Sequence, residues 1–64
     1  MNIRSDAADL DTAILHAAAG LKALEGARRN LEETEAIYPT HIHLSAAELA
    51  HAIELSMRVA LRNS

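Results

Sequence analysis

The sequence predicts an all-α protein, a helical hairpin in which a long helix is followed by an extended connection and a shorter antiparallel helix. Apolar residues recur with a helical period over two long stretches of the chain. The first stretch contains no proline up to about residue 36, and the second follows Pro39. A capping-box pattern, Ser45 followed three residues later by Glu48, precedes the second stretch. These observations divide residues 1–64 into two helices of one small domain.

The first helix is expected over about residues 6–36. Ser5 or Asp6 can serve as its N-cap, and Asp9 and Asp11 place negative charge near the positive end of the helix dipole. Apolar side chains then follow one another in steps of three and four residues, a spacing typical of a coiled-coil seam. The members of this seam are Leu10, Ile14, Ala17, Leu21, Leu24 and Leu31.

A row of small residues lies beside the seam, because Ala13, Gly20 and Ala27 recur every seven residues. Such a row lets another helix approach closely. Close packing would offset the roughly 1 kcal/mol that a glycine costs relative to alanine inside a helix. The alternative explanation is compositional, since abundant alanine and five arginines to one lysine are associated with GC-rich bacterial or phage genomes.

The last part of the first helix, residues 25–35, is charged on all sides. It contains three pairs of opposite charge at i,i+4 spacing, each of which supports an exposed helix by about 0.2–0.5 kcal/mol. This part is either a solvated face or a patch that contacts a protein partner. The candidate partner contacts are Arg28, Arg29 and Tyr38.

The second helix is expected over about residues 46–62. Ser45 is its predicted N-cap, and Leu44 and Leu49 stand where a hydrophobic staple needs them. The connection is therefore assigned to residues 37–44 and is expected to be extended. Eight extended residues are long enough to carry the second helix back to the apolar half of the first.

Both helices carry apolar arcs wider than the roughly 100° that one neighbouring helix covers. The core of a single hairpin would be thin, since fourteen residues are alanine and there is no Phe, Trp or Cys. Small domains with thin cores need a partner subunit, a metal or a disulfide. We therefore expect two copies to form a four-helix bundle. The predicted interface consists of Leu10, Ile14, Ala17, Leu21 and Leu24, facing Leu49, Ile53, Met57 and Ala60.

The candidate metal ligands are histidines. In an extended segment His41 and His43 point to the same side, so that both could bind one divalent ion such as zinc, and His51 follows nearby in the sequence. The alternatives are solvent-facing histidines and a pH-sensitive interface, because charged histidines near a dimer axis repel each other.

Several functional classes are disfavoured. No nucleophile–base pattern and no glycine-rich phosphate loop is present, so we expect neither an enzyme nor a bound cofactor. The formal charge of −3 argues against nucleic acid and anionic membranes as partners. The sequence shows no membrane-spanning run and no signal peptide, which favours the cytoplasm.

The function favoured by the sequence is that of a non-enzymatic protein–protein interaction module, a homodimer that binds a larger protein target. In size and pattern the chain is similar to small two-helix adaptors, secretion co-chaperones and phage inhibitors, with no shared motif from which a residue's role could be transferred. The first alternative is a metal- or pH-responsive helical switch that uses the loop histidines. The second is a nucleic-acid-binding regulator.

Overall fold

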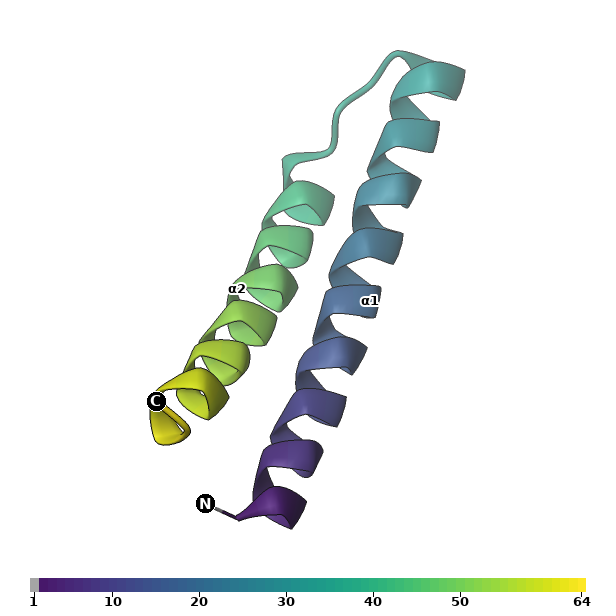
Figure 1. The fold of residues 1–64 in the computed structure, drawn as a ribbon. Helices are drawn as coiled ribbons and strands as arrows, with labels where there is room; N and C mark the ends of the chain where they lie inside the picture. Colours follow the sequence, from purple (N-terminus) through teal and green to yellow (C-terminus); the bar gives the residue numbers. More distant parts are fainter. Residues whose placement is uncertain (1) are drawn as a thin grey trace.

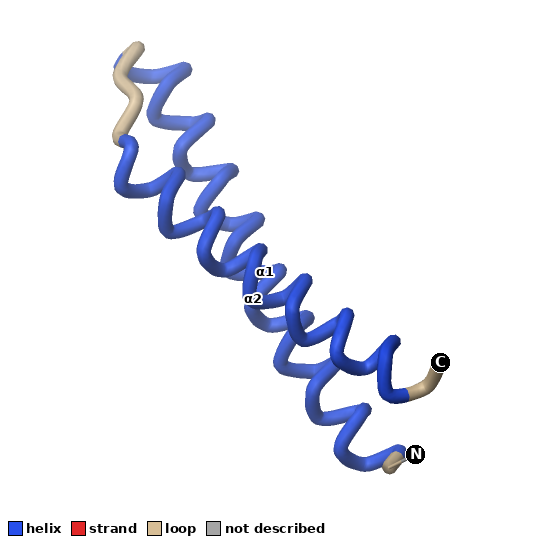
Figure 2. Tube along the Cα trace, turned by 90° about the vertical axis from the view of Figure 1, so that its left-hand side faces the viewer, coloured by secondary structure: helices blue, strands red, loops and turns tan. Residues whose placement is uncertain are grey.

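The computed structural model describes residues 2–64 and shows two α-helices joined by a short connection (Figure 1). Helix α1 spans Ile3–Thr34, and helix α2 spans Pro39–Arg62. The helices lie side by side and run in opposite directions, so the N- and C-termini lie at one end of the hairpin (Figures 1 and 2). Residues 2–64 contain no β-strand. The prediction of an all-α helical hairpin is confirmed.

Helix α1 begins earlier than predicted. Its N-cap is Asn2, whose side-chain oxygen accepts a hydrogen bond from the backbone N–H of Ser5 at 3.1 Å. The helix ends at Glu35, which adopts a left-handed conformation with φ 56° and donates its backbone N–H to the carbonyl of Leu31. The predicted N-cap at Ser5 or Asp6 is therefore wrong by three to four residues.

The start of α2 is the main correction. Pro39 is the first residue of the helix, and Tyr38 is its N-cap. Proline suits the first helical position because its missing N–H would have no partner there in any case. The predicted extended connection 37–44 is wrong, since only residues 35–38 join the helices. Ser45 and Glu48 therefore lie inside a helix and form no capping box.

The contact between the helices is made by small side chains. Ala13 and Gly20 are the buried residues of α1, and Ser45, Ala52 and Leu55 are those of α2. Ala17 packs against this cluster at its edge. Two members of the predicted row of small residues, Ala13 and Gly20, thus lie where α1 meets α2, whereas Ala27 is half-buried and lines an open groove.

Gly20 marks the closest approach of the two helices. A Cβ atom at this position would lie 2.7 Å from Cγ of Leu49 and 3.2 Å from the backbone oxygen of Ser45. The hydroxyl of Ser45, which is completely buried, donates a hydrogen bond to the carbonyl of Gly20 at 2.9 Å. A polar contact therefore sits in the middle of the interface and holds α1 and α2 in register.

The hairpin is a narrow rod with principal dimensions of 49 × 14 × 14 Å. Its radius of gyration is 14.8 Å, whereas a compact domain of this length has a value of about 11 Å. The slender shape follows from the close helix contact, and it leaves most large apolar side chains outside the interface.

The two glycines allow a matched test of the close approach. We expect Gly26→Ala to raise the free energy of unfolding by about 1 kcal/mol, because alanine favours helix and nothing lies within 4 Å of the added Cβ. Gly20→Ala should lower it, since overpacking a close contact costs about 1–3 kcal/mol. Urea denaturation of both variants at equal protein concentration measures the difference. Two stabilised variants would contradict the close contact.

Substitutions at Ser45 test whether this residue lies inside α2 or at the start of a helix. Ser45→Asp should destabilise the protein by several kcal/mol, on the order of the cost of burying an unpaired charge. Ser45→Ala is the control and should cost about 1 kcal/mol through loss of one hydrogen bond. At an N-cap, by contrast, aspartate is as favourable as serine. A Ser45→Asp variant with the stability of the parent in thermal unfolding would restore the capping box.

Candidate interaction face

The two helices leave two long flanks, one polar and one apolar, on either side of their contact. On one side Leu10, Ile14 and Ala17 of α1 line a shallow depression together with Ala52 and Ser56 of α2. Further along the same side, Leu24 and Leu31 of α1 lie beside Ile42 of α2. We call this side the apolar flank. With the helical neighbours of these residues, it comprises Leu10, Ile14, Ala17, Leu21, Leu24 and Leu31 of α1 and Ile42, Leu49, Ile53, Ser56 and Ala60 of α2.

The large side chains of the apolar flank are exposed in the hairpin. Ile14 keeps 65% of its surface, Leu21 55% and Ile53 60%. Of the nine predicted interface residues, only Ala17 and Leu49 are half-buried; the others, Met57 at the outer edge of the flank included, are exposed. The predicted seam is therefore not a core within one chain. As an interface between two chains it stays a prediction.

A groove lies on the apolar flank at the end that carries the connection. Helix α1 extends past the first residue of α2, so that the connection alone crosses its last turns (Figure 1). The groove is almost entirely apolar, with a single charged residue in its wall. Its lining residues are Leu24, Ala27, Arg28, Leu31, Ile37, Tyr38 and Ile42.

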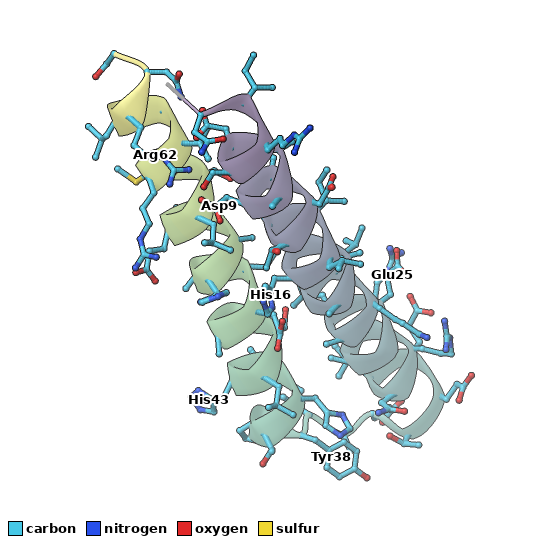
Figure 3. The ribbon with its side chains drawn as sticks, turned by 90° about the horizontal axis from the view of Figure 1, so that it is seen from below. Asp9, His16, Glu25, Tyr38, His43 and Arg62 are labelled. Carbon is cyan, nitrogen blue, oxygen red and sulfur yellow. The ribbon has the colours of Figure 1, made fainter. Side chains whose placement is uncertain are left out.

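The polar flank lies on the opposite side of the helix contact and joins α1 to α2 through charged groups. Nδ1 of His16 lies 2.5 Å from a carboxylate oxygen of Glu48, and the ring of His16 meets that of His51 edge-on, with 4.4 Å between ring centroids. In Figure 3 His16 lies between the two ribbons. This pair accounts for Glu48, which the sequence assigned to a capping box.

Arg62 closes the polar flank at the terminal end of the hairpin. Its guanidinium bridges Asp9 at 2.6 Å and Asp6 at 2.8 Å (Figure 3 shows Asp9 and Arg62 directed toward each other). The hydrogen bond that Arg62 donates to the carboxylate of Asp9 raises the pKa of the Arg62 side chain above its ordinary value. Asn63 adds a hydrogen bond to Asp6. These contacts join the two helices at the terminal end of the hairpin.

The structure does not assemble the predicted metal site. His41 and His43 lie in the first turns of α2, and residues two apart in a helix point about 200° apart, so the extended geometry that would have paired them is wrong. His43 points away from α1 (Figure 3). His51 lies against His16, on the polar flank. Within residues 2–64 no group of three or more His, Asp or Glu side chains is arranged to hold a metal ion.

The predicted partner contacts fall into two places. Arg28 and Tyr38 line the same groove, and Nε of Arg28 pairs with Glu32 at 3.1 Å. Arg29 instead belongs to a second, charged depression on the outer side of α1, together with Glu25, Arg28 and Glu32. Glu25 points away from α2 (Figure 3). Arg28 thus separates an apolar surface from a charged one.

Sequence reasoning missed three contributors to these surfaces. Ile37 and Ile42 were assigned to an extended connection, yet they line the groove. Ser45 was assigned to a cap, yet it is buried against Gly20. For Ile42 and Ser45 the signal is Pro39, because proline at the first helical position indicates that the residues after it continue as a helix; Ile37 precedes Pro39 and stays in the connection.

No family model matches the sequence, and no curated protein or solved structure matches it either. Neither helix found in residues 2–64 is long and apolar enough to cross a membrane. The roles of the residues therefore rest on their own geometry.

The separation of the histidines leads to a prediction about zinc. Adding zinc or EDTA should leave both the molar mass and the melting temperature unchanged, because His41 and His43 cannot reach a common ion from a helix. Light scattering and thermal unfolding check this. A zinc-induced change of mass that the His43→Ala variant lacks would contradict the helical placement of these residues.

Proposed function

We propose that the chain is a small, non-enzymatic protein–protein interaction module that acts as a homodimer and buries its apolar flank against a second copy. The observation that carries this proposal is the row of large apolar side chains on one side of the hairpin. Their counterparts on the polar flank are hydrogen-bonded or ion-paired across the helices. The polar flank is thus joined across the helices within a single chain, whereas the apolar flank exposes side chains that a core normally holds.

The surface area supports a dimer of ordinary size. The hairpin has an accessible surface of 4970 Å², whereas a compact protein of 6.9 kDa has about 4000 Å². The excess of about 1000 Å² is close to the roughly 800 Å² that each partner buries in a standard interface. Covering the apolar flank would therefore bring the surface of each chain to the value expected for its mass.

The small core of a single hairpin also favours a dimer. The buried apolar cluster consists of Ala13, Ala52 and Leu55, of which only leucine is large. At about 25 cal/mol per Å² of apolar surface, two alanines and one leucine supply little free energy against the entropy of ordering two helices. A second hairpin on the apolar flank would add Leu10, Leu21 and Leu24 to a shared core, as in a four-helix bundle.

The contact with a larger protein target is assigned to the charged outer side of α1 near the connection. Arg29 and Glu25 lie there, and Tyr38, half-exposed at the connection, lines the groove that shares Arg28 with this charged surface. Aromatic and arginine side chains are the residues that most often dominate binding energy at interfaces. A homodimer would carry two such surfaces.

A pair of glutamate substitutions tests the homodimer. Leu21→Glu places a charge on the apolar flank and should convert the dimer to monomers, because an unpaired charge is costly at a buried interface. Leu15→Glu is the matched control: Leu15 is 71% exposed and lies outside the apolar flank, so this variant should remain dimeric. Light scattering over a range of protein concentrations gives the molar mass.

Two outcomes would overturn the proposal. One is a parent protein that stays folded and monomeric at all concentrations. The other is a Leu21→Glu variant whose dimer is as stable as that of Leu15→Glu. Helicity measured by circular dichroism on the same samples distinguishes a folded monomer from an unfolded chain.

A further inference from the structure

Along α1, Ile3 and four residues of the apolar flank form a row that is symmetric in size about its centre. Ile3, Leu10, Ala17, Leu24 and Leu31 are each seven residues apart, with two large side chains on either side of one alanine. We propose, on the basis of the homodimer proposed above, that α1 packs antiparallel against α1 of a second copy, with the two-fold axis at Ala17. The connection of each copy then lies over the terminal end of the other.

The spacing makes the row self-complementary. Residues seven apart stay on one face of a slightly supercoiled helix, so the whole row can face one neighbour. A two-fold axis perpendicular to α1 at Ala17 pairs each residue with the one equally far on the other side. Leu10 then meets Leu24 of the second copy, and Ile3 meets Leu31. The alanines meet at the axis, where small side chains allow the closest approach of the helices.

The adjacent positions on α1 fit the same arrangement. Ile14 and Leu21 lie at nearly equal distances on either side of the axis, so they face each other. Arg28, eleven residues after the axis, comes within one residue of the level of Ala7 of the second copy, ten residues before it, and the small alanine leaves room for the arginine side chain to run along the interface with its charge in water. A large polar residue beside the apolar row is thus matched with a small one.

The ends of the hairpin also complement each other. Ile3 is 75% exposed at the terminal end, whereas the groove at the connection end is lined by Leu24, Leu31 and Ile42. The antiparallel arrangement brings Ile3 of the second copy to this groove. In the other two-fold arrangement, with both connections at one end, α1 lies over α2 of the second copy. Ile3 would then lie over the end of α2, beyond Ala60, and not over the groove, since the last residues of α2 lie level with Asp6.

Disulfide trapping tests the orientation, because the chain has no cysteine of its own. A disulfide forms only where Cβ atoms come within about 3.5–4.5 Å of each other. Leu10→Cys and Leu24→Cys chains are mixed, exchanged and oxidised, and the products are separated by mass. We expect the mixed disulfide to exceed both homodisulfides. Leu15→Cys replaces Leu10→Cys as the control and should give no mixed product above background.

Ala17→Cys provides a second, independent measurement. It should cross-link to itself, since the axis passes through this residue, and the substitution removes no large side chain. Molar mass measured on the reduced variants separates the two proposals. Reduced dimers that give neither the Leu10–Leu24 product nor the Ala17 product overturn the antiparallel orientation and leave the homodimer standing. Folded monomers overturn both proposals.

Discussion

The close contact between α1 and α2 at Gly20 determines where every other side chain can go. Because Leu49 and the backbone of Ser45 fill the space that a Cβ would occupy, no side chain fits on α1 at position 20. The buried residues are therefore mostly alanine, glycine and serine, with Leu55 as the large one among those described, and the leucines of the predicted seam on α1 lie on one flank. The hydrogen bond from Ser45 to Gly20 fixes this spacing. A narrow hairpin with a one-sided apolar surface is the direct result.

The two helices could be predicted because their periodic patterns are long, and the small-residue row could be predicted because it repeats three times. The start of α2 could not be fixed by the same reasoning. Two helix-start signals compete, Pro39 at a first helical position and Ser45 with Glu48 in a capping box, and the pattern alone does not rank them. The structure resolves the conflict through tertiary contacts. Ser45 contacts Gly20, 25 residues away, and Glu48 contacts His16, 32 residues away, and no local sequence pattern contains these partners.

The predicted seam shows a second limit of prediction from sequence periodicity. Periodicity identifies residues that share a face, and it correctly grouped Leu10, Ile14, Ala17, Leu21 and Leu24 on one side of α1. It does not say which neighbour covers that face. Two parallel rows on α1, one small and one large, both have a seven-residue repeat, and only the distance between helix axes decides which row meets α2. The prediction that His41 and His43 share a metal ion was wrong for a simpler reason. It required an extended backbone, and the residues that follow Pro39 form a helix instead.

The slender shape of the hairpin has a consequence for how a dimer could engage its targets. In the antiparallel arrangement each pole of the assembly carries one connection, so the charged outer surfaces that include Arg29 lie toward opposite poles of a rod whose single-chain length is 49 Å. Two targets bound there would be held about 36 Å apart along the rod, since each Arg29 lies twelve residues of helix from the axis at Ala17. A bivalent spacer of this kind gains avidity for paired or repeated sites, with an effective concentration set by its rigid length and not by a flexible linker.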